Sequence, residues 1–334
     1  MRIAPWLLTT LVVPGVLGAT VPPQGTPPAP QWFKGNTHTH TTESDGDSSP
    51  EDVTRWYSER DYHFLVLSDH NVHTRIDELS AKFAVPGRFM LMRGEEVTNS
   101  FEGKSIHVNG LDTKTRIGRQ TGASILDILQ KSVDAIREQS GVPHINHPNF
   151  TWALTAEQLQ AVKNNKLFEI YSGHPMVNSL GGGGVPGLEA VWDSILSNGV
   201  VLYGIAVDDA HSFKQPWRSD LSLPGRAWVV VRAMRLEPRA ILEAMERGDF
   251  YASTGVVLDD LQVTRTAMTI AVRKTTFAKY RIQFIGKNGV ILQETLDTPA
   301  IYTFRGNEGY VRAKVIESNG LVAWIQPIIV GARP

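Results

Sequence analysis

Short apolar segments alternate with amphipathic helical patterns from Trp32 to Val257, and this alternation restricts the possible folds more than any other feature. Ser49 stands where an N-cap would precede a helix that has Pro50 in its first position. Repeated alternation predicts an α/β fold with a mainly parallel sheet, most simply a (β/α) barrel. Candidate strands lie at residues 64–67, 89–92, 106–108, 142–145, 167–171, 200–205 and 228–231.

The pattern changes at Leu258, after which apolar and polar residues alternate without a helical period. Turn signals such as Ser318-Asn319-Gly320 divide the strand-like segments. This predicts a small all-β, sandwich-like domain over residues 258–334, attached to the preceding domain as an appendage. Pro327 predicts that the last strand, residues 322–329, is either an edge strand or shorter.

The first nineteen residues have the pattern of a signal peptide, with Arg2 before an apolar run and small residues ending at Ala19. The apolar run is short and contains Pro5 and Pro14, so it predicts no stable membrane span. Residues 20–31 are rich in proline and predict an extended linker to a domain at residues 32–257. We therefore expect export to the periplasm or the medium, and the alternative is an uncleaved N-terminal anchor.

The composition excludes some partners and some metal ligands. A formal net charge of −1 and a pI of about 6.8 create no overall field that favours nucleic acid or an anionic membrane. Because the chain has no cysteine, any metal must be held by imidazole and carboxylate groups. Such ligands suit Mn, Zn or Fe. We expect a small-molecule substrate and no nucleic-acid partner.

Histidine and carboxylate residues recur where apolar segments end. In Thr37-His38-Thr39-His40, an extended chain places both imidazoles on one face, about 6.5–7 Å apart. Side chains at the carboxyl ends of parallel barrel strands converge on one mouth, which predicts a shared site. The later members of the series are Asp45, Asp69-His70, Glu95-Glu96, His107, His147, and Asp208-Asp209 with His211.

The order His-x-His, Asp, Ser-Asp-His, Gly-x-Glu, His, His-Pro, Asp-x-His resembles the PHP superfamily, named for polymerase and histidinol phosphatase. Two sequence motifs are similar to those of its carbaryl-hydrolase-like branch: Gly94-Glu-Glu-Val-Thr98, and Gly-Asp-Phe-Tyr-Ala-Ser-Thr-Gly within residues 228–256. The resemblance covers residues 32–257, and the β-rich tail is similar to an appendage of that branch. It implies a distorted (β/α)7-type PHP barrel followed by the small β domain.

The resemblance also implies a centre of two or three divalent ions. Its motifs select Glu96 over Glu95 and Asp209 over Asp208. Glu96, Asp209 and His211 are the predicted catalytic residues. His38, His40, Glu96 and Asp209 would hold one ion, Glu96 would bridge to a second ion on His107 and His147, and Asp45, His70 and His211 would hold a third.

Three further residues, Asp69, Glu169 and His174, are candidates to orient these ligands, because a ligating imidazole usually needs a partner on its other nitrogen. An alternative role for Asp69 is to cap the turn after its strand. A water bridging the ions would have its pKa lowered from ~15.7 toward ~7, which gives hydroxide at neutral pH. The same ions would polarise a phosphoryl or carbonyl oxygen.

The sequence thus predicts a metal-dependent phosphoesterase that acts on a phosphomonoester or a small phosphodiester. A carbamate or carboxylic ester hydrolase is an alternative, since the same hydroxide could attack either bond. A second alternative is a non-catalytic surface-binding protein, against which the complete set of nine ligands argues. The predicted export and the near-neutral charge argue against a polymerase-associated proofreading module.

Overall fold

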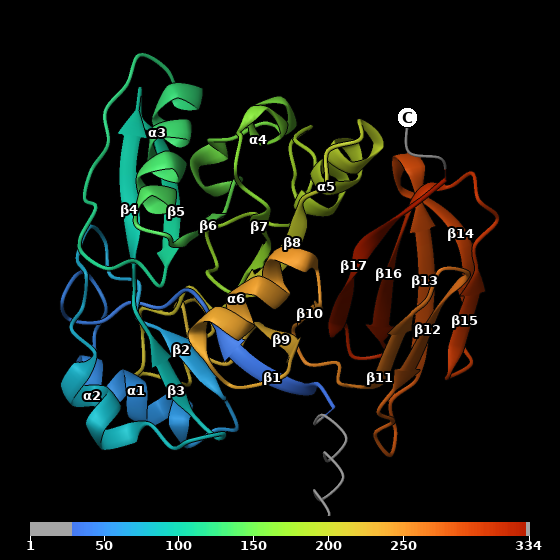
Figure 1. Cartoon of the computed structure of the whole chain (residues 1–334), viewed down its shortest axis with the longest axis horizontal. Coiled ribbons are helices and arrows are strands. Elements are labelled where there is room, and N and C mark those ends of the chain that lie inside the picture. The colour runs from blue at the N-terminus through green and yellow to red at the C-terminus, as the bar shows by residue number, and fades with distance from the viewer. Residues whose placement is uncertain (1–28, 332–334) are drawn as a thin grey trace, which may run out of the picture.

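The computed structural model describes residues 29–331, in which an α/β part lies beside a β-sandwich (Figure 1). The predicted signal peptide and most of the proline-rich linker fall outside the described residues. Within residues 29–331, no helix combines the length and apolar character needed to cross a membrane.

The α/β part is built from two sheets that share a core. Phe64 of one sheet and Leu167 of the other belong to the same buried cluster, together with Met245 of helix α6. One sheet has the order β4 (Gly94–Phe101), β5 (Lys104–Leu111), β6 (Val142–Ile145), β7 (Leu167–Ser172) and β8 (Tyr203–Val207). The other contains β10 (Phe250–Ser253), β9 (Trp228–Ala233), β1 (Gln31–Asn36), β2 (Phe64–Val66) and β3 (Met90–Met92), in that order.

The described residues have the predicted mixed α/β fold but form no closed barrel, because the α/β strands fall into two separate sheets, and the distorted (β/α)7-type barrel stays a prediction. Strand β4 was missed from the sequence, and it forms a hairpin with β5 through Glu102 and Gly103, whose φ angles are 48° and 77°. Such a two-residue turn reverses the chain, so β5 runs antiparallel to both β4 and β6. Isolated parallel bridges, Thr39 to Ala210 and His70 to Glu96, link the strand ends of the two sheets.

The first helix begins where the sequence predicts, since the Ser49 side chain accepts the N–H of Asp52 at 3.2 Å and Pro50 is the first helical residue. At another helix start, Thr155 and Gln158 form a capping box. Helices α3, α4 and α5 bury one face against the β4–β8 sheet. The helices are α1 (Pro50–Ser58), α2 (Asp77–Phe83), α3 (Ile125–Glu138), α4 (Ala156–Ala161), α5 (Leu188–Ser197) and α6 (Pro238–Arg247), with a 3₁₀ turn, η1, at Phe150–Trp152.

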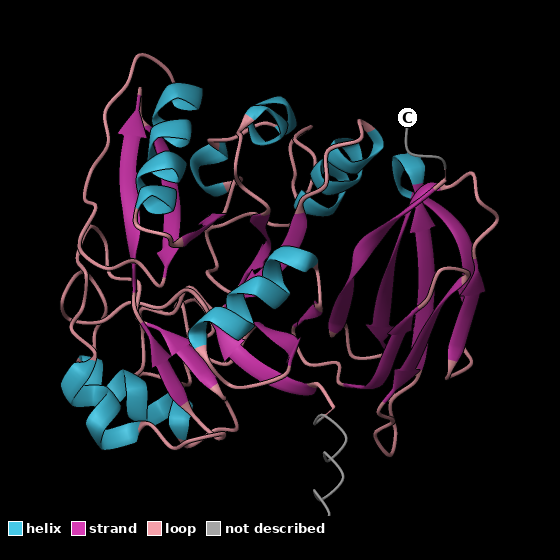
Figure 2. Ribbon diagram, in the orientation of Figure 1, coloured by secondary structure: helices cyan, strands magenta, loops and turns pink. Residues whose placement is uncertain are grey.

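Figure 2 shows strands throughout the tail, where the only helical segment described is the 3₁₀ turn η2 (Lys287–Gly289). The first strand of the tail begins at Leu258, although the division of the chain into domains stays a prediction. One layer contains β11 (Leu258–Val263), β12 (Ala267–Val272) and β15 (Ala300–Thr303). The other contains β14 (Val290–Thr295), β13 (Tyr280–Gly286), β16 (Gly309–Glu317) and β17 (Val322–Val330).

The tail shares a sheet with the α/β part, because β17 pairs with β10 and the strands of both parts form one nine-stranded sheet. The expectation of a short or edge strand at residues 322–329 is wrong, since β17 lies between β10 and β16. Pro327 fits there because it follows Ile325, the last residue paired with β10, and lies at an irregularity in the pairing with β16.

Candidate metal centre

The predicted site residues lie at the strand ends where the two sheets approach one another. His38 and His40 follow β1, His70 follows β2, and Asp209 and His211 follow β8. The Nε2 atoms of His38 and His40 are 3.1 Å apart, as expected for imidazoles on one face of an extended segment. Both side chains are fully buried, so their ring nitrogens converge in a site with little access to water.

Glu96 of β4 lies at the centre of this site. Its carboxylate is fully buried, and its Oε2 atom has no hydrogen bond of acceptable geometry. A buried carboxylate oxygen without such a partner is costly unless a cation or another donor satisfies it. Imidazole nitrogens lie 3.4 Å (His38), 3.6 Å (His40), 2.6 Å (His70), 2.9 Å (His107) and 3.3 Å (His147) from its oxygens.

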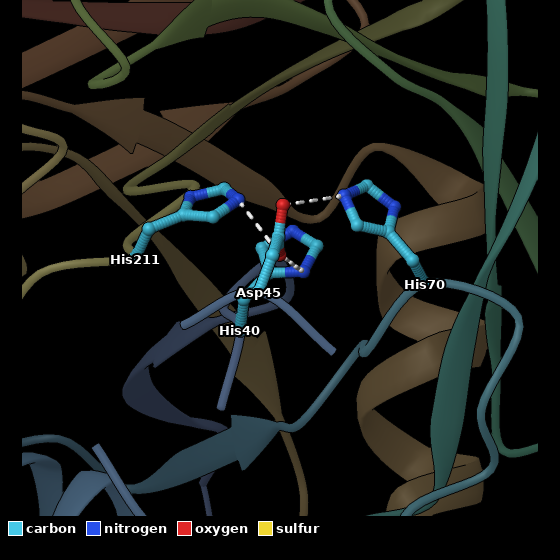
Figure 3. Close-up of side chains that lie close together, drawn as sticks. All are labelled: His40, Asp45, His70 and His211. Atoms are coloured by element: carbon cyan, nitrogen blue, oxygen red, sulfur yellow. Dashed lines mark ion pairs between the residues drawn. The ribbon is translucent and has the colours of Figure 1, made fainter. Parts of the chain in front are cut away.

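The side chains form four overlapping groups, and within each group the potential ligand atoms lie within 4.8 Å of one another. Figure 3 shows one of them, in which Asp45 points between the imidazoles of His70 and His211, above His40. Each of the nine predicted ligands occurs in at least one group, and within residues 29–331 the groups contain no other residue. The groups are His40–Asp45–His70–His211, His38–His147–Asp209, His38–His40–Glu96 and His70–Glu96–His107.

The grouping differs in part from the predicted sets. His40 lies with the set predicted for the third ion, and His147 lies with His38 and Asp209. Both rearrangements follow from the short distances between neighbouring imidazoles, which let one ring border two groups. Ligation of metal by these nine residues stays a prediction.

The surrounding charges keep the two central carboxylates ionised despite their burial. Burial opposes the charged form of Glu96, but His70, His107 and His38 hold its pKa well below the usual value. Burial also opposes the charged form of Asp209, but His38, His40 and His211 hold its pKa well below the usual value.

The imidazoles divide into neutral and charged rings. Burial, together with His211 and His70, lowers the pKa of His40 to about 4, so the ring is neutral at pH 7. Burial is outweighed at His70, where Glu96 and Asp45 raise the pKa to about 10. A divalent ion would replace such protons, because imidazole binds metal in its neutral form.

Glu169 of β7 supports the site from behind. Its Oε1 atom lies 2.7 Å from Nδ1 of His38, and its Oε2 atom accepts the backbone N–H of His147 at 2.8 Å. This contact fixes the ring of His38 with Nε2 facing Glu96 and Asp209. The structure thus places Glu169 where the sequence expectation put an orienting residue.

Asp69 has a different environment, in which its carboxylate forms no hydrogen bond with any of the nine ligands. It accepts bonds from the backbone and hydroxyl of Thr41, from Ser44 and from Thr74, at 2.6–2.9 Å. These bonds hold the loop that carries Asp45. The geometry therefore favours the turn-capping role for Asp69.

The two neighbouring acidic residues point away from the cluster. Glu95 accepts the N–H groups of Ile117 and Gly118 at 2.6 and 3.0 Å. Asp208 accepts a bond from the Tyr57 hydroxyl at 2.8 Å and three backbone N–H groups of residues 225–227. Both side chains thus have hydrogen-bond partners away from the cluster, and the selection of Glu96 and Asp209 as ligands stays a prediction.

Asn146 was missed from the sequence. Its amide donates to Glu96 at 2.7 Å and to Asn109 at 2.8 Å, so it fixes the orientation of the central carboxylate. Its position directly before His147 at the end of β6 was the available signal. His147 and Asp209 have φ angles of 21° and 50°, which non-glycine residues rarely adopt and which are common at functional sites.

A cavity of about 350 Å³ opens above the cluster. His107, His147, Asp209 and His211 form its floor, and His174 lines its wall without belonging to any of the four groups. A small molecule that enters this cavity would therefore reach the candidate ligands directly.

No family model matches the chain. It is 30% identical over 105 residues to a 5'-3' exoribonuclease from Haemophilus influenzae, a match that covers 31% of this chain and 36% of the relative. The chain thus aligns with about a third of that relative.

Among solved structures, the chain resembles a two-domain protein from Bacteroides vulgatus that contains a predicted PHP-like metal-dependent phosphoesterase. The TM-score is 0.53 at 15% identity, and the match covers 92% of this chain and 100% of the other. An amidohydrolase from Chromobacterium violaceum matches with a TM-score of 0.41 at 15% identity, over 57% of this chain and 92% of the other. The first likeness shows that the chain shares the overall fold of the Bacteroides vulgatus protein.

Proposed function

We propose that this chain is a metal-dependent phosphoesterase of the PHP superfamily. The observation that carries the proposal is the convergence of nine histidine and carboxylate side chains, distant in sequence, in one cluster beneath a cavity. The fold shared with the Bacteroides vulgatus protein supports the assignment. The sequence motifs around Glu96 and within residues 228–256 support assignment to the carbaryl-hydrolase-like branch.

The donor set fits two or three divalent ions of the Mn, Zn or Fe type, because it combines imidazoles with carboxylates and has no thiolate. Glu96 Oε2, which lacks a satisfactory hydrogen bond, has the position of a ligand to a cation. When bound, such ions supply an acidified water as nucleophile and shield negative charge on the scissile group.

The chain's own residues would prepare the site for this chemistry. Glu169 fixes His38, Asn146 fixes Glu96, and neither side chain needs to move when a substrate enters. Asp209 and His211 border the cavity, whereas Glu96 lies beneath it. We propose these last three as the catalytic residues, because they would hold ions next to the scissile bond.

The test combines elemental analysis of the purified chain with a screen of phosphomonoesters, phosphodiesters, carboxylic esters and carbamates. We expect two or three ions per chain, hydrolysis of a phosphate ester, loss of activity with a chelator and recovery with Mn²⁺, Zn²⁺ or Fe²⁺. Undiminished turnover in metal-free protein would refute the proposal.

The same screen separates the alternatives. Preferential hydrolysis of a carbamate or carboxylic ester would support the second candidate activity, which the same cluster could perform. The partial similarity to an exoribonuclease makes a 5'-phosphorylated RNA a necessary member of the panel. Metal binding without hydrolysis of any member would favour a non-catalytic surface-binding protein.

We also propose export of the enzyme to the periplasm or the medium, on the signal-peptide pattern of residues 1–19. The test fuses residues 1–30 to a reporter that is active only outside the cytoplasm. Reporter signal is expected, and retention of an inactive fusion in the cytoplasm would contradict export.

A further inference from the structure

We infer that the cavity selects esters with an uncharged, apolar leaving group, and that His174 is a specificity-determining residue that donates a hydrogen bond to the ester. The inference rests on the proposed function, since it concerns the substrate of the same site. It follows from three features of the cavity: an apolar wall, a described lining without lysine or arginine, and the orientation of one imidazole.

The first feature is the apolar wall beside the ligand cluster. Phe150, Pro175, Met176 and Leu221 line the cavity and come from three separate segments of the chain. The Phe150 ring centroid lies 5.3 Å from that of His147 and 6.4 Å from that of His107. An ester bond placed over these histidines therefore has an aromatic side chain within contact distance of its leaving group.

The second feature is the charge of the lining. Among the described residues that line the cavity, none is lysine or arginine, whereas three are aspartates: Asp45, Asp209 and Asp220. Two arginines near the cavity have other partners. Arg218 pairs with Asp220, and Arg226 donates to the backbone carbonyls of Gly173 and Ser219. Away from the ligand cluster, an anionic leaving group would thus find a carboxylate in the lining but no lysine or arginine to pair with it.

The third feature is His174. Its Nδ1 atom accepts the backbone N–H of Met176 at 3.2 Å, and the backbone N–H of His174 donates to Ser172 Oγ at 3.2 Å. A neutral ring whose Nδ1 is an acceptor carries its proton on Nε2. Within residues 29–331 no hydrogen bond involves Nε2, so this N–H is available to a substrate oxygen in the cavity.

His174 differs from the ligand histidines in a way that makes it testable. It lies outside all four ligand groups, although its ring centroid is 5.5 Å from that of His211. Its replacement should change substrate binding without changing the number of bound ions. Met176 is 61% exposed and lines the wall, so a charge introduced there should not disturb the core.

The experiment measures binding by calorimetry to the full, metal-loaded chain, with two uncleavable analogues as probes, phenylphosphonate and 4-carboxyphenylphosphonate. We expect phenylphosphonate to bind roughly tenfold or more tightly, because only the second probe buries a carboxylate without a cation. Met176→Lys should reduce this ratio by about threefold or more, since it adds a cation to the wall. Leu180→Lys, on the same loop but outside the lining and 87% exposed, is the matched control and should leave the ratio unchanged.

His174→Leu should weaken binding of both probes by roughly five- to tenfold with an unchanged metal count, and His174→Gln, which keeps a donor, should restore most of the affinity. Equal affinity for the two probes, or no effect of Met176→Lys, would overturn the apolar subsite. A loss in His174→Leu that His174→Gln does not rescue would overturn the donor role. Because binding is measured without turnover, selective binding by a chain that hydrolyses no ester would refute the proposed function and leave this inference standing.

Discussion

Gln326 of β17 forms two hydrogen bonds with the backbone of Gly204 in β8: its amide donates to the Gly204 carbonyl at 2.8 Å, and its carbonyl accepts the Gly204 N–H at 2.9 Å. A single side chain thus satisfies both polar groups of a residue on an edge strand. Since Asp209 and His211 follow β8, a tail residue supports the strand that leads into the candidate centre.

Removal of the tail is therefore expected to disrupt the α/β part. A chain ending at residue 257 would expose the edge of β10 and the apolar surface around Trp192, which packs in one cluster with Tyr310 and Trp324. We expect this chain to be insoluble or to unfold without cooperativity. Soluble yield and urea unfolding followed by circular dichroism test this, and a soluble fragment with the midpoint of the full chain would contradict it.

A buried ion pair joins α5 to β16. Arg312 donates to both carboxylate oxygens of Asp193, at 2.7 and 2.6 Å, and its side chain is 2% exposed. Arg312→Met should lower the free energy of unfolding by about 3–5 kcal/mol, because it leaves Asp193 without its cation. The double variant Arg312→Met/Asp193→Leu should recover much of this loss.

The control for this pair is Arg239→Met on α6, whose exposed i,i+4 pair with Glu243 should contribute less than about 0.5 kcal/mol. Urea unfolding of all four proteins provides the comparison. If the double variant is as unstable as Arg312→Met, the loss comes from packing and the ion-pair explanation is incorrect.

The site was more predictable from the sequence than the sheet that supports it. A histidine or carboxylate directly after an apolar segment is a local signal, and the structure brings such residues together, for example His70, His147 and His211. The pairing of β10 with β17 joins segments far apart in sequence and could not be inferred. The β4–β5 hairpin is local and was missed because its two-residue turn at Glu102 and Gly103 was not recognised. The hydrogen bonds of Asp69 to Thr41 and Ser44 span 28 and 25 residues, so they could not be inferred from the local sequence either.

Glu169 gives a prediction about metal affinity. Glu169→Gln can no longer accept bonds through both oxygens from His38 and His147, so it should lower metal affinity by about 10- to 100-fold, and Glu169→Ala by at least as much. Titration against a chelator of known affinity measures the change. Glu157→Gln, at an exposed position of α4, is the control, and an affinity of the Glu169 variants equal to that of the control would exclude an orienting role.

His63 gives a prediction about pH. Burial lowers its pKa below 6.5, and its Nδ1 accepts the N–H of Lys34 at 3.0 Å. Below pH ~6.5 the unfolded chain therefore binds a proton that the folded chain resists, so this contribution to stability is present above pH ~6.5 and decreases as the pH falls. His63→Gln should reduce the loss of stability between pH 7.5 and 5.5, as measured by urea midpoints in matched buffers. An identical pH dependence in the variant would show that His63 does not titrate in this way.

The last prediction concerns Glu96 and its neighbour. Among the described residues, only Glu96 has five imidazoles around its carboxylate, so Glu96→Gln should disturb more than one group of ligands and lower the metal content by more than one ion. His211 belongs only to the group that contains Asp45, so His211→Ala should remove at most one ion. Glu95→Gln should keep the ions, because Glu95 bonds to Ile117 and Gly118 on the other side of the strand.

Elemental analysis of the three purified variants, joined to kcat/KM on one common ester, decides between these expectations. Because Glu96 lies between the groups, its variant should also show the largest loss of activity, whereas Glu95→Gln should stay within a few-fold of the unmodified chain. Loss of ions in Glu95→Gln with retention in Glu96→Gln would mean that the neighbouring carboxylate holds the metal. Retention of every ion in both variants would show that the centre does not depend on a bridging glutamate, since no other glutamate occurs in the four groups of the described chain.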